Sequence, residues 1–293
     1  MAAASGFKRK KQEKRDTACK LILPLHDRFS AQGILCIPTA RFVDPAIQKK
    51  LAIECQRLLP RDKYVDKHLP QEIAIIHQLA SMIPEIERKM SLVIDIGGGN
   101  GDLAYLISQI LQVDVMVIDN HVPVTKIDDS PSADLSHFSR LVADVRDVSF
   151  TNDEKFSGKK LYLACKHLCG TSLDLVISHI SSIKTDNIRG FVFAPCCYHK
   201  NKPLDFLKQD LLSESDFEAI RYFCDWKTAE TFLAHTPDKK EQYSLGSIAQ
   251  NIINSVRISL LNHTFSTNMI EFVPCTVTPK NILLIGSLRD PRK

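Results

Sequence analysis

The sequence predicts an α/β fold in which a mostly parallel sheet of seven strands ends in an antiparallel hairpin. Short runs rich in Val, Ile and Leu follow one another from residue 91 onward, and helical stretches separate several of them. These runs show little polar alternation, which is typical of strands whose two faces are both buried. The last two runs are joined by a link too short for a crossover, so that pair must be antiparallel.

The first five strands are expected in the middle of the chain, with helices between them. The apolar runs lie at 92–96, 113–119, 141–143, 160–164 and 189–194. Helical patterns occupy 102–111, after the first run, and 172–183, after the fourth. Strands that alternate with helices form parallel pairs, because the helix carries the chain back across the sheet.

The hairpin is expected at the C-terminal end. A long helix near 247–262 precedes strands at 269–273 and 282–288, and the turn between these strands contains Pro274 and Pro279. A parallel sheet that is covered by helices and closed by an antiparallel hairpin resembles the class I methyltransferase fold, which is Rossmann-like. The methyltransferase domain is expected to cover residues 89–290.

Two regions precede this domain. Residues 21–88 are predicted to form a helical N-terminal region, with helices at 45–58 and 70–82 and turn signals such as Pro24. Residues 1–20 are predicted to be a disordered arm, with seven basic side chains against two acidic ones in a chain of net charge +4. Such a cluster binds phosphate backbones, acts as a nuclear address, or is simply a solvated terminus.

Composition excludes several classes of protein. Of the 293 residues, 44% are hydrophobic and 25% are charged, so a wholly disordered or collagen-like chain is excluded. No run of about 18 or more apolar residues exists, and we expect no membrane-spanning helix. The N-terminus lacks an apolar signal core, so an intracellular protein is expected, with the nucleus or cytoplasm favoured over an organelle. The nine cysteines are then thiols or metal ligands rather than disulfides.

A glycine loop follows the first predicted strand. Asp95 precedes Gly97, Gly99 and Gly101 at two-residue intervals, and a helix begins directly afterwards. Glycines let a ligand approach the backbone closely, and the helix that follows presents free N–H groups. Dinucleotide-binding enzymes share this arrangement, but the acid two residues before the first glycine resembles the S-adenosylmethionine-binding motif. The alternative is a turn that serves only tight packing of strand and helix.

Two further acids are expected to hold this cofactor. Asp119 closes the next strand, where it could accept both ribose hydroxyls. Asp144 lies just past the third strand and is placed to meet the adenine amino group. The alternative for each acid, and for Asp144 above all, is an ordinary surface position.

Reactive side chains cluster after the fourth and fifth strands. Because ligands bind at the carboxyl ends of parallel strands, we expect these side chains to crowd the mouth of the cofactor pocket. The side chains are Lys166, His167, Cys196, Cys197, Tyr198 and His199.

Three interpretations of this cluster stay open. In the first, His167 or His199 is a base that removes a hydroxyl proton, while Lys166 holds a phosphate or lowers the pKa of the hydroxyl. In the second, a zinc ion is bound, for which the ligands would be Cys165, Cys169, Cys196, Cys197 and His199. In the third, the thiols are small buried hydrophobes. We predict no metal site, because neither half has Cys-x-x-Cys spacing.

Several of these residues resemble a known family. The run KHLCG at 166–170 with Asp174 after it, the Cys-Cys-Tyr-His run at 196–199 and the closing segment 272–284 resemble the eukaryotic tRNA 2′-O-methyltransferases that modify position 4 of the acceptor stem, the Trm-thirteen type. The resemblance covers roughly residues 90–288. It implies that Lys166, His167 and His199 handle the ribose and its phosphate, and that Cys196 and Tyr198 shape the pocket.

The sequence departs from the pattern of that family in two respects. Members of that family carry N-terminal zinc modules, whereas Cys19, Cys36 and Cys55 are scattered singly here, and Tyr198 replaces a histidine. The resemblance implies an S-adenosylmethionine-dependent RNA methyltransferase, and the expected RNA partner is tRNA. The alternatives are methylation of a protein or small molecule, and a catalytically silent assembly factor on an RNA–protein particle. A dehydrogenase is disfavoured by the acid before the glycines and by the hairpin.

Overall fold

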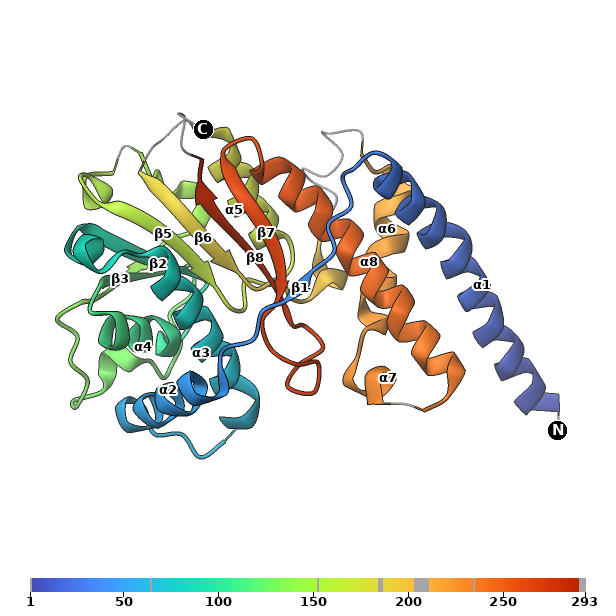
Figure 1. Ribbon diagram of the computed structural model, residues 1–293, viewed down its shortest axis with the longest axis horizontal. Coiled ribbons are helices and arrows are strands. Elements are labelled where there is room, and N and C mark those ends of the chain that lie inside the picture. The colour runs from blue at the N-terminus through green and yellow to red at the C-terminus, as the bar shows by residue number, and fades with distance from the viewer. Residues whose placement is uncertain are drawn as a thin grey trace.

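The architecture is seen in a computed structural model (Figure 1). It describes residues 2–63, 65–151, 153–183, 187–202, 211–233 and 235–289, with side chains from residue 12 onward. The expected end of the catalytic domain at residue 290 lies outside these ranges.

One eight-stranded sheet organises the chain, in the order β1-β7-β8-β6-β5-β2-β3-β4. Strand β8 pairs antiparallel with β6 and β7, and the other pairings are parallel. The strands are β1 (Thr39–Ala40), β2 (Ser91–Ile96), β3 (Asp114–Asp119), β4 (Phe138–Val142), β5 (Lys160–Cys165), β6 (Ile188–Phe193), β7 (Phe265–Glu271) and β8 (Ile282–Leu288).

The predicted α/β class and the terminal hairpin are confirmed, but the predicted count of seven strands is wrong by one. The additional strand is β1, where Thr39 pairs with Ile270 at the edge of the sheet. Both of its residues are exposed and the strand has only two of them, so no apolar run marked it in the sequence.

Helices cover both faces of the sheet (Figure 1). One face packs against α2, α3 and α4, and the other against α5 and α8. Along β2, Val93 points to the first layer while Leu92 and Ile94 point to the second, which explains why this strand is apolar throughout. The helices are α1 (Ala2–Ala31), α2 (Pro45–Leu58), α3 (Val65–Met82), α4 (Asp102–Leu111), α5 (Thr171–Ser182), α6 (Glu214–Phe223), α7 (Ala229–Leu233) and α8 (Pro237–Leu261).

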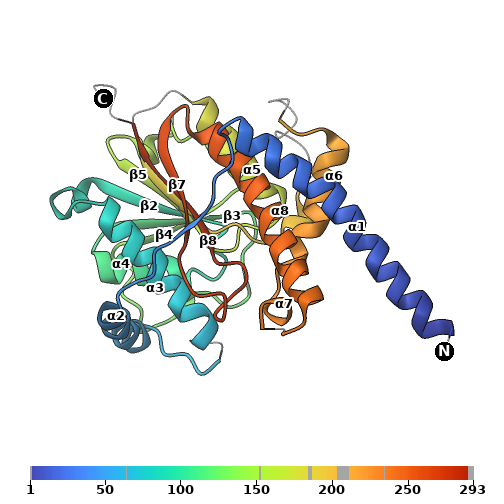
Figure 2. The ribbon, with the colours of Figure 1, turned by 45° about the vertical axis from the view of Figure 1, so that its right-hand side comes forward.

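The N-terminal segment differs from the expected disordered arm. Residues 2–31 form helix α1, and Pro24, expected to mark a turn, lies inside it. Figure 2 shows α1 running beside α8 and α6, away from the sheet. Ile22 and Phe29 are fully buried against these helices, and Arg15 pairs with Asp238 at 2.8 Å. Apolar positions three or four residues apart therefore dock the helix despite its basic start.

None of the described helices combines the length and hydropathy that crossing a bilayer requires.

Candidate active site

A crevice runs along the carboxyl ends of the parallel strands, and three adjoining cavities form it. The Glu72 cavity, of about 320 Å³, lies between α3 and the glycine loop. The Asp119 cavity, of about 410 Å³, lies on the other side of Gly97, which lines both. The His199 cavity, of about 210 Å³, shares Lys166 and His167 with the Glu72 cavity.

The glycine loop holds Asp95 beneath the crevice. A Cβ atom at Gly98 would lie 2.6 Å from Asp95 Oδ2, so any other residue there would displace the Asp95 carboxylate. Gly99 donates its N–H to Asp119 Oδ2 at 2.9 Å, and Gly101 is the N-cap residue of helix α4. The loop thus connects the two predicted cofactor acids through its own backbone.

Asp95 is a buried carboxylate that lines the Glu72 cavity. It is 1% exposed, and its Oδ2 accepts no hydrogen bond from any described residue. Burial raises the pKa of Asp95 to about 7, against the opposing charge of Lys166 and with support from Glu72 and Asp119. An unsatisfied buried carboxylate oxygen is costly unless a donor completes it. This atom therefore fits a ligand that carries a cationic donor.

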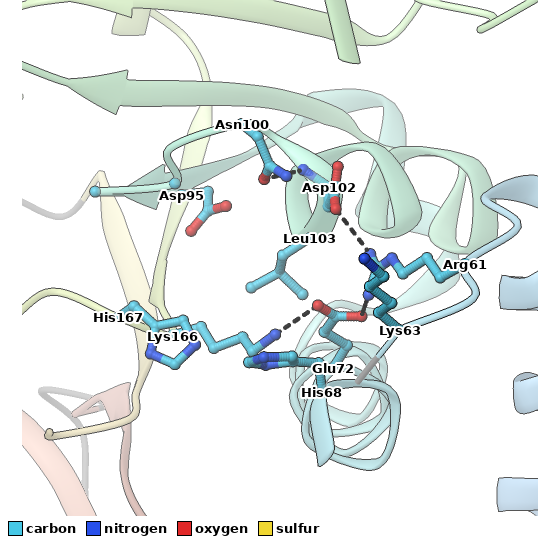
Figure 3. Close-up of a pocket in the computed structure, with 12 residues that line it drawn as sticks. Arg61, Lys63, His68, Glu72, Asp95, Asn100, Asp102, Leu103, Lys166 and His167 are labelled. Carbon is cyan, nitrogen blue, oxygen red and sulfur yellow. Dashed lines mark hydrogen bonds and ion pairs between the residues drawn. The ribbon is translucent and has the colours of Figure 1, made fainter. Parts of the chain in front are cut away.

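A chain of ion pairs forms the opposite wall of the same cavity (Figure 3). Glu72, from α3, accepts from Lys166 Nζ at 2.5 Å and from Arg61 at 2.6 Å. Arg61 lies 3.2 Å from Asp102 at the start of α4. Glu72 is only 3% exposed, so the pairing is largely shielded from water. Lys166 is thereby fixed in one orientation at the junction of two cavities.

Glu72 and Arg61 were not among the site residues predicted from the sequence. The available signal was a charged residue at the start of an otherwise apolar helical pattern, followed directly by Ile73. That pattern gives no partner for the charge, because Lys166 lies 94 residues further along the chain.

The Asp119 cavity contains the other two predicted cofactor acids. Asp119 accepts from the Gly99 N–H and, at 3.0 Å, from the His121 N–H, which fixes its carboxylate at the end of β3. Asp144 is paired with Arg146 at 2.7 Å, and hydrogen bonds from the Arg146 side chain and backbone lower the pKa of Asp144 to about 2. Asp144 is therefore charged at neutral pH, and both acids line one cavity.

Two histidines flank the His199 cavity and differ in environment. Burial lowers the pKa of His167 to about 4, with help from the charge of Lys166 and from His68, whose ring lies 5.8 Å away. His199 is half exposed, and its Nδ1 lies 2.8 Å from Asp225 Oδ2. A carboxylate at Nδ1 favours the tautomer whose Nε2 is free to accept a proton. His199 consequently has the geometry of a general base, whereas His167 is an uncharged side chain that lines the cavity.

Tyr198 is not in the crevice. It is 1% exposed, and its hydroxyl accepts from Asn254 Nδ2 at 2.9 Å within helix α8. Arg257 stacks over its ring with 5.5 Å to the centroid. The expectation that Tyr198 shapes the pocket is therefore not supported. The Tyr198 side chain instead points into the core, where it anchors the loop after β6.

The structure brings most of the strand-end thiols together. The Sγ atom of Cys169 lies 3.1 Å from that of Cys196 and 3.2 Å from that of Cys197. Cys165, which was grouped with them on the sequence, is fully buried in the core on β5.

The strand order, the glycine loop and the crevice above it define a class I methyltransferase fold. Residues 71–287 match the family model described as Methyltransferase TRM13. The chain belongs to this family, as the run at 166–170 indicated.

Curated relatives carry related names at low identity. The tRNA:m(4)X modification enzyme TRM13 homolog of Dictyostelium discoideum is 24% identical over 184 residues, which cover 56% of this chain and 34% of that protein. The tRNA:m(4)X modification enzyme TRM13 of Schizosaccharomyces pombe is 21% identical, over 76% of this chain and 68% of that protein. The chain thus spans about a third of the first relative and about two thirds of the second.

Among solved structures, the plantazolicin methyltransferase BpumL in complex with SAH superposes with a TM-score of 0.37 at 11% identity, over 96% of this chain and all of that one.

Proposed function

We propose that the chain binds S-adenosylmethionine across the Glu72 and Asp119 cavities and methylates a ribose 2′-hydroxyl of tRNA. The observation that carries this proposal is the buried Oδ2 of Asp95, which has no hydrogen-bond partner among the described residues and lies in a cavity that adjoins two strand-end carboxylates. A cofactor ammonium group would complete Asp95, ribose hydroxyls would donate to Asp119, and the adenine amino group would donate to Asp144. When bound, the cofactor supplies an electrophilic methyl group on sulfur.

The acceptor is expected in the His199 cavity. Lys166 stands at the junction with the Glu72 cavity, where its ammonium group can hold a phosphate beside the reacting hydroxyl. His199, with Nδ1 held by Asp225, takes the hydroxyl proton on Nε2. His167 stays uncharged at neutral pH because its pKa is low, so it does not repel a cationic methyl donor. It orients the acceptor and leaves the proton to His199.

Positive charge around the same cavity supports a polyanionic acceptor. Lys67, Lys166 and Lys280 line the His199 cavity, and Lys202 lines the Asp119 cavity. Lysines spread along a crevice bind successive phosphates of a nucleic acid. Family membership and the names of the relatives favour tRNA as that nucleic acid. As part of this proposal we place the protein inside the cell, in the nucleus or the cytoplasm.

An extract-labelling experiment tests the class of acceptor. The purified chain is incubated with methyl-labelled S-adenosylmethionine and a cell extract, and portions are then treated with ribonuclease or protease. We expect the methyl label to be released by ribonuclease and to be unaffected by protease. Label released by protease alone would replace RNA with a protein acceptor. The absence of label in every fraction would favour the silent assembly factor.

A further inference from the structure

Three cysteine thiols converge at the wall of the His199 cavity, and the proposed methyl transfer uses none of them. The Sγ atoms of Cys169, Cys196 and Cys197 all lie within 4.8 Å of one another. Cys196 and Cys197 also line the cavity. No other His, Cys, Asp or Glu among the described residues joins this group within the same distance. We infer that these three thiols bind one zinc ion.

Two loops are held together so that the thiols meet. Cys169 follows β5, and Cys196 and Cys197 follow β6, which is paired in parallel with β5. A Cβ atom at Gly170 would lie 3.1 Å from the Lys200 carbonyl oxygen, so the glycine allows the two backbones to touch. Next to this contact, the Lys202 N–H donates to Thr171 Oγ1 at 3.2 Å. The convergence is therefore built into the loop packing.

The backbone of Cys197 adds a second observation. Its φ of 48° and ψ of 47° place it in the left-handed region, which is uncommon for a residue other than glycine. Such a conformation persists where surrounding structure holds it, and it is concentrated at ligand-binding sites. The left-handed conformation turns the chain directly after Cys196, so the side chains of Cys196 and Cys197 both point to the Cys169 thiol.

The spacing of the sulfur atoms suits a shared cation. Zinc–sulfur bonds of about 2.3 Å in a tetrahedral site place two sulfurs about 3.8 Å apart. The observed separations of 3.1 and 3.2 Å need only a small outward movement of Cys196 and Cys197 from Cys169. A disulfide would use two of the thiols and leave the third crowded against it. An all-thiolate set selects a soft or borderline metal, of which zinc is the ordinary tetrahedral one.

Binding is a ligand exchange without a change of oxidation state. The zinc ion loses coordinated water and forms three zinc–sulfur bonds, and the three thiols release their protons to the buffer. One tetrahedral position remains for water or another ligand. The ion would tie the loop after β5 to the loop after β6 beside Lys166 and His199. This revises the expectation from the sequence that no metal site exists.

Metal analysis of the purified chain tests the inference. The protein is prepared without chelators under reducing conditions, and zinc is quantified by mass spectrometry. We expect about one zinc ion per chain. The Cys169→Ser variant should lose it, whereas Cys19→Ser, a partly exposed cysteine on α1, should keep it. Cobalt added to the metal-free protein should give thiolate-to-cobalt charge-transfer absorption, a readout that does not depend on any variant folding or on methylation.

Three results would overturn the inference. One is a wild-type protein that neither contains zinc nor takes up zinc or cobalt. Another is a disulfide between Cys169 and Cys196, found by peptide mass spectrometry in protein prepared under the same conditions. The last is zinc that persists when all three cysteines are replaced by serine in a variant with native circular dichroism.

Discussion

At the residue scale, the proposed chemistry rests on polar side chains that the fold holds in place. Asp95 is kept at the bottom of the crevice with an oxygen that no described residue completes. Lys166 is held by Glu72, and His199 by Asp225. Each proposed functional group therefore has a fixed position before any ligand arrives, which reduces the entropy that binding must overcome.

The first prediction concerns cofactor affinity. Replacing Asp95 with Asn removes the carboxylate charge from a site where we expect a cationic donor. A hydrogen bond to a charged group contributes about 1.5–3 kcal/mol, so the Kd for S-adenosylmethionine should rise about 10-fold to 100-fold. Isothermal titration calorimetry measures this. Asp114→Asn, at the opposite end of β3, is the matched control and should bind as wild type.

The same residue predicts how stability depends on pH. The folded-state pKa of Asp95, about 7, lies above its unfolded value, so the folded protein binds the extra proton between about pH 4 and pH 7. The contribution of Asp95 therefore makes cofactor-free protein lose stability as the pH rises through this window. Asp95→Asn should be more stable than wild type at pH 8 and equal to it near pH 4, by urea denaturation. A variant less stable at pH 8 would show that Asp95 is not buried as described.

The third prediction concerns His199 as the general base. His199→Ala should lower kcat by about 10²–10⁴-fold, the usual effect of losing a general base, and leave cofactor affinity unchanged. His137 forms a similar pair with Asp114, at 2.9 Å, at the opposite end of β3 from Asp119. His137→Ala is therefore the control, and kcat should be unaffected. Equal losses of kcat in both variants would exclude a specific role for His199.

Spacing alone predicted some site residues and not others. Asp95 and Asp119 follow from their places at strand ends, because the strands set where the chain meets the crevice. Glu72 and Asp225 gain their importance from contacts with Lys166 and His199, which depend on the packing of α3 and of the segment after α6. Tyr198 was misassigned since a strand-end position does not determine to which side a side chain turns.

At the element scale, the central strands could be predicted and the edges could not. Strands β2, β3, β5 and β6 are apolar because both faces are covered, and this leaves a clear pattern. Strand β1 has two exposed residues and depends on β7 for its conformation. Helix α1 was obscured by its basic residues and Pro24, although its apolar spacing is helical. Docking against α6 and α8 decides its structure.

A prediction for α1 follows from this docking. Phe29 is fully buried among α1, α6 and α8, so Phe29→Ala should destabilise the protein by about 3–5 kcal/mol in urea denaturation. Leu23 lies on the same helix but is 42% exposed, and Leu23→Ala should cost much less. If both variants unfold at the same urea concentration as wild type, α1 does not dock on the domain in solution.

At the scale of the whole molecule, one sheet edge gathers the proposed ligand-binding groups from distant segments. The N-terminal helices supply Glu72, the central strands supply Asp95 and Asp119, and the later loops supply Lys166 and His199. The two larger cavities adjoin at Gly97, and Lys166 and His167 connect the first of them to the third. This continuity is what a transfer between two bound molecules requires.

The most direct test of this account is nucleoside analysis of tRNA after reaction with the purified chain and S-adenosylmethionine. We predict new 2′-O-methylated nucleosides, detected by mass spectrometry after complete digestion, and a loss of that signal with Lys166→Ala. Methyl groups found on bases, or unmodified tRNA despite measured cofactor binding, would contradict it.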